Sequence, residues 1–415
     1  MWLLDKMLRV LIREGRLEVT DYDGKLYAYG DPLAAPLRIR FTDKGAAMHV
    51  AKDPQVGAGE AYMDGRLVVE RPHDIRDLVL LVTGNARQGR GKGLSAPSRL
   101  RRLIDGLAAR VDQINPRGRA SRNVVHHYDL SRRFYELFLD DDRQYTMAYF
   151  REGLPVEGRA LERAQSDKKA LIAAKLRLQP GMRVLDIGCG WGGLGLYLHQ
   201  HYGVEVVGVS LAPDQVAFAN ERAMALGVAQ KVQFRLTDYR DVAEPFDRIT
   251  SVGMIEHVGA PQFREYFGKT HELLADDGIM LTHTIGRVTP PGTTDKWTRK
   301  YIFPGGYIPA MSELVAATEL TGWEMGDIEV LRYHYAHTLA EWYRRTCANE
   351  AEIVKLYDQR LFRMWQYYLA GAEQSFRHGG MVNFHLQTVK RRNVLPTTRG
   401  YILEEAERLF AVNAG

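Results

Sequence analysis

The stretch Arg183–Leu198, RVLDIGCGWGGLGLYL, decides the fold of this protein. An apolar strand, Val184–Ile187, leads into a turn with glycine at positions 188, 190, 192 and 193, and a helical pattern follows. Glycine lets the backbone turn sharply and approach a ligand closely. The spacing Gly188-x-Gly190-x-x-Gly193 satisfies the fingerprint of dinucleotide-binding proteins. Because several nucleotide-like ligands use such a turn, the spacing indicates a class of ligand without identifying one.

From about Asn123 onward, strand-like runs alternate with helical patterns. This order is typical of an α/β protein with a parallel, doubly wound sheet, whose ligands bind at the carboxyl ends of the strands. Farther on, Ala336–Arg377 predicts long helices with a mostly apolar, aromatic face. The predicted strands are Arg183–Ile187, Val204–Val209, Lys231–Leu236, Phe246–Gly253 and Ile279–Thr284, and the predicted helices are Gly192–His201, Pro213–Leu226 and Pro261–Leu274.

Residues 1–85 predict a small α+β module. An opening helix is followed by the strand-like runs KLYAYG, LRIRF and DGRLVVE and by a helical run, DIRDLVLLV. The first residues, MWLLDKMLRVLIREGRL, are apolar but interrupted by charges. They therefore indicate an amphipathic helix rather than a signal peptide or a membrane span. Such a helix packs on its own module or contacts a membrane.

A basic segment, residues 86–122, separates the two regions and predicts a flexible linker. It contains ten Lys or Arg and two Asp, which gives a net charge of +8. This charge fits a solvated linker or attraction to anionic lipid headgroups. Binding to nucleic acid is less favoured, because no interleaved aromatic residues are present to stack on bases. The predicted parts are thus 1–85, 86–122 and 123–415.

The composition is that of a globular protein, with 45% hydrophobic and 26% charged residues. A net charge of +5 suits an anionic partner such as a phospholipid surface or nucleic acid. The only cysteines are Cys189 and Cys347, which exclude a disulfide framework and a zinc cluster and indicate a reducing compartment. No metal site is expected at His126 and His127, because no Cys or acidic cluster stands beside them.

The carboxylate of Asp186 narrows the choice of ligand at the glycine turn. It lies just before the first glycine and would repel the pyrophosphate of a nicotinamide dinucleotide. S-adenosylmethionine has no phosphate and carries a sulfonium and an α-ammonium, both of which a carboxylate attracts. The second strand ends in VVGVSLAPDQ, where Ser210 and Gln215 supply hydrogen-bonding groups and Asp214 comes late. We therefore expect S-adenosylmethionine, with a dinucleotide as the alternative.

The fourth and fifth strands indicate what accepts the methyl group. Enzymes that methylate base amines commonly end the fourth strand with a proline pair and an aromatic residue, whereas this strand ends in SVGMIEHVGA, with Glu256 and His257. Nucleic acid is therefore not the expected partner. The run LTHTIG places His283 at the end of the fifth strand, and topology brings it near Glu256. A single His at a strand end is also a common structural residue.

An ordered set of motifs resembles the cyclopropane fatty acid synthase family, including the mycolic acid cyclopropane synthases. The set covers most of residues 57–376. The resemblance implies a Rossmann-like class I methyltransferase domain with helical insertions and C-terminal helices, preceded by a small N-terminal lipid-handling domain. It also implies action on double bonds in phospholipid acyl chains. The motifs are GEAYMDG, HHYDLSRRFYELFLD, YTMAYF, VLDIGCGWGG, GVSLAPDQ, DYRD, IEHVG, HTIG, FPGG and HYAHTL.

The same resemblance implies roles for individual residues. Around the donor, Tyr145 and Thr146 would border the ligand, Gly188 and Gly190 would approach its methionine part, Ser210 and Gln215 its ribose, and Tyr239 its adenine. A bicarbonate ion, which members of the family hold in the active site, would be bound by Glu256, His283, Tyr335 and the backbone of Ile285. Next to a bicarbonate ion, we expect Glu256 to be protonated or to share a proton with it.

Two positions depart from the family pattern. Met147 and Ala372 stand where the family usually has cysteines, which leaves the product open. A carbocation formed on the acyl chain gives a cyclopropane if its new methyl group loses a proton to a base, and a methyl-branched or methylene chain if a neighbouring carbon does. We expect the cyclopropane. The alternatives are the branched product, and a methyltransferase acting on nucleic acid or another small molecule.

The resemblance also gives an expected location and assembly. An enzyme that acts on bilayer phospholipids would be cytoplasmic and peripheral at the inner membrane face. The family makes a homodimer plausible.

Overall fold

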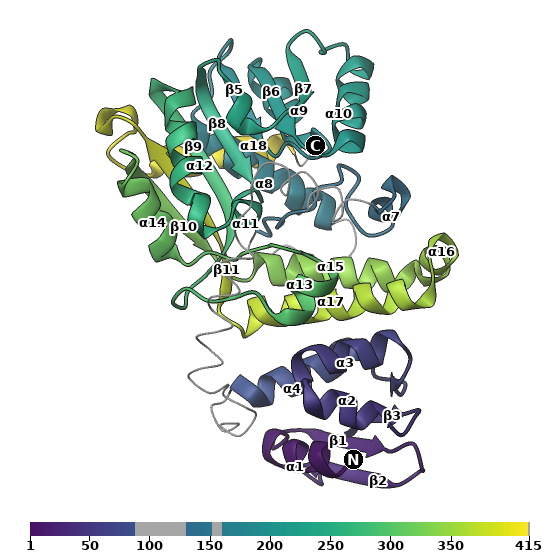
Figure 1. Cartoon of the computed structure of the whole chain (residues 1–415). Helices are drawn as coiled ribbons and strands as arrows, with labels where there is room; N and C mark the ends of the chain where they lie inside the picture. The colour runs from purple at the N-terminus through teal and green to yellow at the C-terminus, as the bar shows by residue number, and fades with distance from the viewer. Residues whose placement is uncertain (88–129, 152–159, 414–415) are drawn as a thin grey trace. The chain divides into compact units, whose positions relative to one another are not determined.

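The computed structural model describes residues 1–87, 130–151 and 160–413 (Figure 1). The chain forms two compact units. The first contains the N-terminal residues together with Asp295–Ile302 and Leu339–Gly380, and the second contains the other described residues. Of the linker predicted at 86–122, only Ala86 and Arg87 are among the described residues, and His126 and His127 lie outside them.

The first unit combines a four-stranded sheet with helices. The strand order is β2-β1-β3-β4, with β1 and β3 parallel and the other neighbours antiparallel. Its strands are β1 (Arg16–Thr20), β2 (Leu26–Gly30), β3 (Pro36–Phe41) and β4 (Leu67–Val69). Its helices are α1 (Trp2–Leu11), α2 (Ala46–Lys52), α3 (Pro54–Met63), α4 (Ile75–Arg87), α13 (Lys296–Tyr301), α16 (Glu350–Leu356), α17 (Gln359–Arg377) and most of α15 (His334–Ala348).

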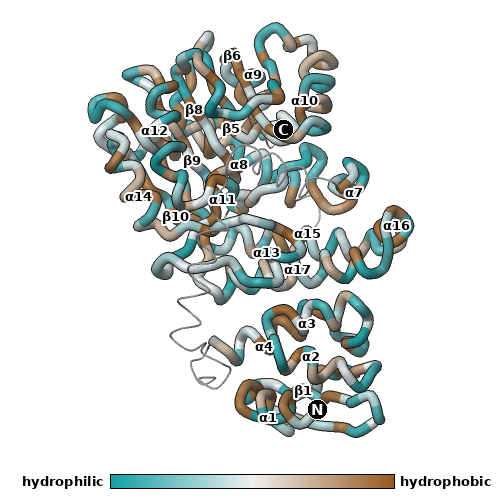
Figure 2. The backbone as a smooth tube through the Cα atoms, viewed as in Figure 1, coloured by the Kyte–Doolittle hydropathy of each residue, from teal (hydrophilic) through white to brown (hydrophobic). Residues whose placement is uncertain are grey.

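Helix α1 is amphipathic, as the sequence predicts. Leu4, Leu8 and Leu11 are buried at the spacing of one helix face, whereas Trp2 is 69% exposed. Figure 2 shows both hydrophobic and hydrophilic residues along α1. One face of the helix packs on its own unit and leaves the Trp2 side chain at the surface.

Two late segments of the chain pack with the N-terminal residues inside the first unit. The Arg76 guanidinium of α4 donates to both carboxylate oxygens of the buried Glu373 of α17, at 2.6 and 2.8 Å. Glu60 of α3 accepts hydrogen bonds from Lys300 and Tyr301 of α13, each at 2.6 Å. These late segments belong to the predicted part 123–415, and they share one compact unit with the N-terminal residues.

The second unit is built on a seven-stranded sheet of order β10-β11-β9-β8-β5-β6-β7. Strands β9, β8, β5, β6 and β7 are parallel and correspond to the five predicted strands, which confirms the α/β fold. Strand β11 is antiparallel to both of its neighbours, and neither it nor β10 was predicted. The strands are β5 (Arg183–Ile187), β6 (Glu205–Ser210), β7 (Val232–Leu236), β8 (Phe246–Val252), β9 (Leu274–Arg287), β10 (Glu324–Leu331) and β11 (Met381–Val389).

Helices cover both faces of this sheet because its central strands are apolar on both sides. Val184 and Val206 belong to a buried cluster with α8 (Ala160–Leu176), α9 (Gly193–Tyr202), α10 (Pro213–Ala225) and α18 (Gly400–Val412). Leu185 and Val207 belong to a second cluster with α12 (Phe263–Leu273) and α14 (Met311–Glu319). The short elements are α7 (Arg132–Glu136), α11 (Ile255–Val258), η1 (Tyr239–Asp241), η2 (Ala260–Gln262) and η3 (Arg392–Val394).

The chain order reverses between β5 and β8, the two strands at the centre of the sheet. From β5 the chain continues to β6 and β7 on one side, then returns to β8 and β9 on the other. In doubly wound sheets this switch point opens a crevice at the carboxyl ends of the strands. The glycine turn follows β5 and α11 follows β8, so both border that edge.

Within residues 1–87, 130–151 and 160–413, no helix has both the length and the apolar character that crossing a bilayer requires.

Gly193, the first residue of α9, tests how tightly the turn is packed. A Cβ at Gly193 would lie 2.1 Å from Oδ2 and 2.5 Å from Cγ of Asp142, a short side chain held by two cations. We expect Gly193→Ala to lower the free energy of unfolding by about 1–3 kcal/mol, as overpacking does. Gly268→Ala in α12 is the control, because its Cβ would meet only Thr321 Cγ2 at 3.8 Å, and alanine favours a helix by about 1 kcal/mol. Urea unfolding of both variants checks this, and equal stabilities would contradict it.

Candidate active site

The turn after β5 has open space at its first two glycines. Gly188 and Gly190 have φ angles of +81° and +53°, in the left-handed region. A Cβ at Gly190 would meet no heavy atom within 4 Å, and one at Gly188 would meet Met254 at 3.6 Å. At Gly192, by contrast, a Cβ would lie 2.7 Å from Cβ of Ala219 in α10. The turn therefore packs closely at Gly192 and leaves room for a ligand at Gly188 and Gly190.

Asp186, in β5, offers this open turn a buried carboxyl group. Its side chain is 1% exposed, and Oδ2 has no hydrogen-bond partner among the described residues. Burial raises the pKa of Asp186 to about 7, although the Lys168 ammonium acts in the opposite direction. A cationic group of a ligand would supply the missing partner. Together with the space at the glycines, this fits the α-ammonium and methionine part of S-adenosylmethionine.

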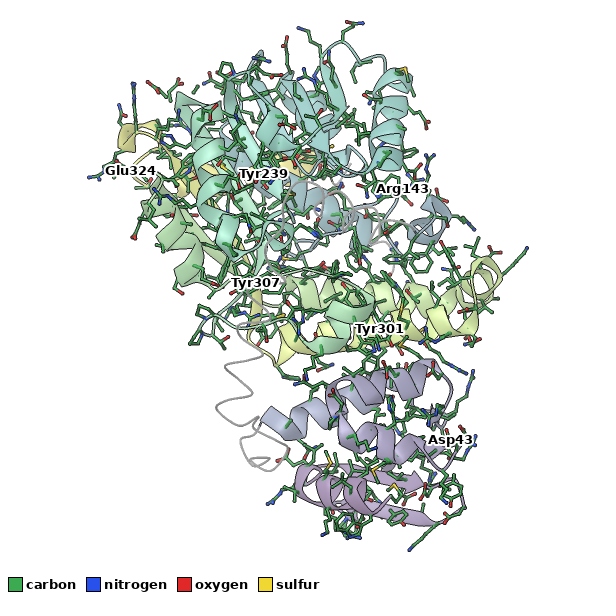
Figure 3. The ribbon with its side chains drawn as sticks, viewed as in Figure 1. Asp43, Arg143, Tyr239, Tyr301, Tyr307 and Glu324 are labelled. Carbon is green, nitrogen blue, oxygen red and sulfur yellow. The ribbon has the colours of Figure 1, made fainter. Side chains whose placement is uncertain are left out.

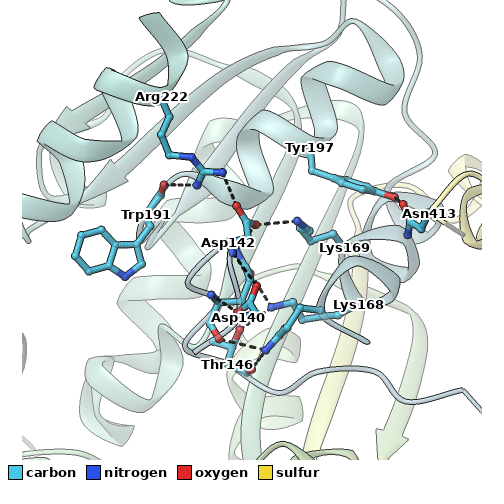
Figure 4. A network of polar contacts seen from close by, with 11 residues as sticks. Asp140, Asp142, Thr146, Lys168, Lys169, Trp191, Tyr197, Arg222 and Asn413 are labelled. Carbon is cyan, nitrogen blue, oxygen red and sulfur yellow. Dashed lines mark hydrogen bonds and ion pairs between the residues drawn. The ribbon is translucent and has the colours of Figure 1, made fainter. Parts of the chain in front are cut away.

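A charged network ties the segment before α8 to the glycine turn (Figure 4). Asp142 accepts hydrogen bonds from Lys169 Nζ at 2.7 Å and from Arg222 at 2.5 Å. Arg222 also donates to the carbonyl oxygen of Trp191, inside the turn, at 3.0 Å. Burial opposes ionisation of Asp142, but the charges of Lys169 and Arg222 hold its pKa below the usual range. The ionised carboxylate thus joins α8, α10 and the turn.

Lys168 positions Thr146, one of the residues expected to border the donor. Its buried ammonium donates to Thr146 Oγ1 at 2.8 Å and to Gln144 Oε1 at 2.7 Å (Figure 4). The amide of Gln165, one turn earlier in α8, donates to the Thr146 carbonyl oxygen at 2.9 Å. Burial lowers the pKa of Lys168. Thr146 is therefore held on both its side chain and its backbone by α8.

The other predicted donor residues lie at or after the ends of β6 and β7 and in the segment before α8. Ser210 ends β6, and its hydroxyl accepts a hydrogen bond from the Ala212 N–H at 3.2 Å. Gln215 is buried in α10. Tyr239, labelled in Figure 3, lies in η1 after β7, with its ring centroid 5.3 Å from that of Tyr266. The ring of Tyr145 lies 5.7 Å from that of Tyr135. Their roles toward a donor stay predictions.

Glu256 and Ile285 are brought into direct contact. Oε1 of Glu256, in α11, accepts a hydrogen bond from the Ile285 backbone N–H of β9 at 2.6 Å. The Thr284 hydroxyl donates to the Ile285 carbonyl oxygen at 2.9 Å, and Oε2 of Glu256 has no hydrogen-bond partner in the described part of the chain. Burial raises the pKa of Glu256 to about 7, with the Ile285 N–H opposing the rise. The backbone of Glu256 is fixed by the Tyr307 N–H, which donates to its carbonyl oxygen at 2.9 Å.

His283 lies on the same face of β9 as Ile285, because the two are separated by one residue. It is 1% exposed, and burial lowers its pKa to about 3, so its ring is neutral. Its Nδ1 lies 2.8 Å from Nε2 of His385, and its Nε2 lies 3.3 Å from Nδ2 of Asn383. Glu256 contacts the backbone of Ile285, two residues after His283 on β9, and the proximity of the Glu256 and His283 side chains stays a prediction.

Tyr335 and Met147 are placed by contacts between neighbouring residues. Tyr335 lies in the first turn of α15, next to His334, whose Nδ1 accepts a hydrogen bond from the Phe150 N–H at 3.1 Å. Thr338, one turn later, accepts one from the Ala148 N–H at 2.9 Å. Met147, directly before Ala148, is fully buried. The start of α15 therefore packs along the segment that carries Met147.

Several residues of this region were not predicted from the sequence. They are Asp140, Asp142, Lys168, Lys169, Lys175, Asn383 and His385. One signal was available: Lys168 and Lys175 are seven residues apart in a helix rich in Ala, Leu and Ile, so both lie on one face. Lysine at that spacing within an apolar helix indicates a buried cation with a partner.

The comparisons with known proteins agree on one family. Residues 116–386 match the family described as mycolic acid cyclopropane synthetase. The cyclopropane-fatty-acyl-phospholipid synthase of Escherichia coli (strain K12) is 37% identical over 344 residues, which cover 83% of this chain and 85% of that protein.

Solved structures give the same result. The cyclopropane synthase MmaA2 from Mycobacterium tuberculosis is 32% identical and superposes with a TM-score of 0.61, covering 66% of this chain and 99% of that one. The mycolic acid cyclopropane synthase CmaA1 complexed with SAH and CTAB has the same identity and TM-score, with coverage of 67% and 99%. The resemblance and the methyltransferase-type fold inferred from the sequence are thereby confirmed.

The titration of Asp186 predicts how the affinity for S-adenosylmethionine depends on pH. The carboxylate attracts the donor only when it is ionised, so affinity should rise as the pH increases through about 7. Asp186→Asn should weaken binding by about 10- to 100-fold, the range of a charge-assisted hydrogen bond, and flatten the pH dependence. Isothermal titration calorimetry between about pH 5.5 and 8.5 measures both effects. Asp276→Asn, at the exposed amino end of β9, is the control, and equal affinities of the two variants would refute the assignment.

Proposed function

This chain belongs to the mycolic acid cyclopropane synthetase family, and on that premise we propose that it forms cyclopropane rings on unsaturated acyl chains of phospholipids. The reaction would transfer a methylene unit from S-adenosylmethionine to a cis double bond. The observation that carries the proposal is the pair of buried carboxyls Asp186 and Glu256 beside the carboxyl ends of adjacent strands β5 and β8. Ionised Asp186 suits a cationic donor, and protonated Glu256 suits an anionic base.

The donor site follows from the turn and the segments around it. When bound, S-adenosylmethionine supplies a methyl group on positively charged sulfur, which is reactive enough for an alkene without lone pairs. Asp186 would bind the ammonium, and Gly188 and Gly190 would leave room for the methionine part. The remaining groups would border the ribose and adenine: Tyr145, Thr146, Ser210, Gln215 and Tyr239.

The acid–base site would hold a bicarbonate ion between Glu256, His283, Tyr335 and the Ile285 backbone. Bound there, bicarbonate supplies a base for the proton lost at ring closure. Glu256 has a pKa of about 7, and a neighbouring anion would raise it further, so its carboxyl would be protonated. Its unpartnered Oε2 would then donate a hydrogen bond to the anion, while Oε1 keeps the Ile285 N–H.

Water must be excluded from the site, because it would trap a carbocation on the acyl chain. Met147 and His283 are buried, and so is the ring of Tyr335. Met147 replaces a cysteine of the family pattern with a longer apolar side chain, which changes the shape of the site without adding a nucleophile. Ala372 lies in α17 of the first unit. A methyl-branched product stays the alternative outcome.

The N-terminal residues would present the enzyme to a membrane surface. Trp2 and Leu33 are 69% and 94% exposed, and Lys6 lies 4.1 Å from the Trp2 ring centroid. Exposed tryptophan beside lysine suits the boundary between lipid headgroups and acyl chains. We therefore propose that residues 1–85 handle lipid and that the protein attaches peripherally to the cytoplasmic face of the inner membrane. As the family suggests, we also propose a homodimer.

Product analysis tests the proposed function. The protein is incubated with methyl-labelled S-adenosylmethionine and vesicles of monounsaturated phospholipid, and the fatty acids are read by mass spectrometry and NMR. A cyclopropane with loss of the double bond is the expected product. Label with a retained double bond would select the branched product. Label only in added RNA or in a small molecule would overturn the proposal.

Glu256→Gln tests the role assigned to the carboxyl. The amide oxygen can keep the Ile285 N–H, but the side chain no longer exchanges a proton. We expect donor affinity within about twofold of the wild type and a kcat about 100-fold lower, the scale of acid–base catalysis. Wild-type kcat should also fall at a pH above 7, where Glu256, its pKa raised further by the bound anion, loses its proton, whereas the variant should lack that step. Glu265→Gln, exposed in α12, is the control. Parallel loss of donor binding would show that the role is misplaced.

A further inference from the structure

Three titratable residues are direct neighbours across β10, β11 and β9. Glu329 is the register partner of His385, and His385 is the register partner of His283. Direct cross-strand partners project from the same face of a sheet. The three side chains thus form a row that runs from the edge strand inward to the strand that carries the acid–base site.

Lys175 of α8 completes this row. Its Nζ lies 3.0 Å from Nδ1 of His385 and 2.5 Å from Oε2 of Glu329. On the other side of the ring, Nε2 of His385 lies 2.8 Å from Nδ1 of His283. Each step is a hydrogen-bond distance. The chain His283–His385–Lys175–Glu329 is therefore continuous from atom to atom.

The two ends of the chain lie in different surroundings. His283 and His385 are each 1% exposed, and the Lys175 side chain is fully buried. The Glu329 side chain, in contrast, is 27% exposed to solvent. At the inner end, His283 is on the same strand face as Ile285, the backbone partner of Glu256. The chain therefore links the acid–base site to water.

We propose that His283, His385, Lys175 and Glu329 form a proton relay that carries the proton released in the acid–base site to solvent. The inference rests on the proposed function, because ring closure must release one proton. There a C–H bond of the new methyl group breaks, its electron pair forms the last ring bond, and the proton leaves. Directly or after a first acceptor, it reaches Nε2 of His283.

The hydrogen-bond row has two self-consistent arrangements. In the arrangement that accepts the proton, Nδ1–H of His283 donates to Nε2 of His385, and Nδ1–H of His385 donates to Lys175 Nζ, which has first passed a proton through Glu329 to water. A proton added at Nε2 of His283 shifts each proton one step outward and leaves Lys175 as an ammonium that donates to His385. The ammonium then gives a proton to Glu329 and water. Each imidazole accepts at one nitrogen and donates at the other, as neutral histidine requires.

Burial disfavours positive charge on the relay residues. Burial lowers the pKa of Lys175, opposed by Glu329 and Asp327 and assisted by Arg399. Burial also lowers the pKa of His385, and the positive fields of Lys175, His283, His334 and Lys168 lower it further. No step of the relay then has to store a second positive charge among buried groups.

Asn383 supplies a partner for the inner end in both arrangements. It is the register partner of Ile285 and lies on the same strand as His385. Its Nδ2 lies 3.3 Å from Nε2 of His283, while its Oδ1 is buried with no hydrogen-bond partner among the described residues. The Asn383 amide N–H can donate to Nε2 of His283 while that nitrogen carries no proton. Once Nε2 is protonated, the amide can rotate so that its oxygen accepts from Nε2–H.

Proton release measured separately from methyl transfer tests the relay. In single turnovers under weak buffering, a pH-indicator dye reports the proton, and quenched samples report S-adenosylhomocysteine. In the wild type, one proton should appear with each methyl transfer. In Glu329→Gln and Lys175→Met, proton appearance should lag methyl transfer by about tenfold or more. Glu324→Gln is the matched control, because Glu324 lies on the same strand and pairs only with Arg392 among the interactions of its carboxylate in the described residues.

The outcomes separate the relay from the proposed function. If the wild type makes no ring and releases no proton, the proposed function fails. If the wild type does both, and Glu329→Gln releases protons as fast as Glu324→Gln, the relay is refuted. Donor binding by calorimetry confirms that each variant is folded. Should Lys175→Met not fold, the Glu329→Gln variant, at a partly exposed position, decides alone. If Lys175 and Glu329 have a purely structural role, their variants would be less stable, but proton release and S-adenosylhomocysteine formation would keep the same time course.

Discussion

Helix α8 carries three lysines into the interior of the second unit, and the site depends on their partners. An ammonium removed from water costs several kcal/mol unless it is paired. Lys168 donates to the segment that we propose borders the donor, Lys169 to the carboxylate network at the glycine turn, and Lys175 to the edge strand β10. Because one rigid helix holds all three, the three regions are fixed relative to one another.

The sequence predicted the parts of the site that depend on chain order. The strand Arg183–Ile187 was predicted with its observed bounds, because an apolar run ends at glycines with positive φ. Glu256 was expected near the end of the fifth strand, since parallel neighbours end at the same edge, and it contacts Ile285 there. Local pattern and topology were sufficient for these residues.

Side-chain contacts between distant parts of the chain could not be predicted from local pattern and topology. His283 and His385 are 102 positions apart, and Lys175 precedes His385 by 210. Strand β11 was not predicted. It follows a run of long helices, and its sequence does not indicate which strands it pairs with. The late helices α13 and α17 likewise gave no sign of joining the first unit, since Glu373 finds Arg76 only after folding.

Asp186 and Glu256 show how one physical cause can prepare two carboxyls for opposite tasks. Burial raises both pKa values to about 7, so neither protonation state is strongly preferred in the free protein. A cation next to Asp186 stabilises its ionised form, whereas an anion next to Glu256 stabilises its protonated form. The ligands themselves would therefore drive the two titrations apart. Charge balance would then be kept by the ligands, because Lys168 offsets the burial of Asp186 only in part and the burial of Glu256 is opposed only by hydrogen bonds.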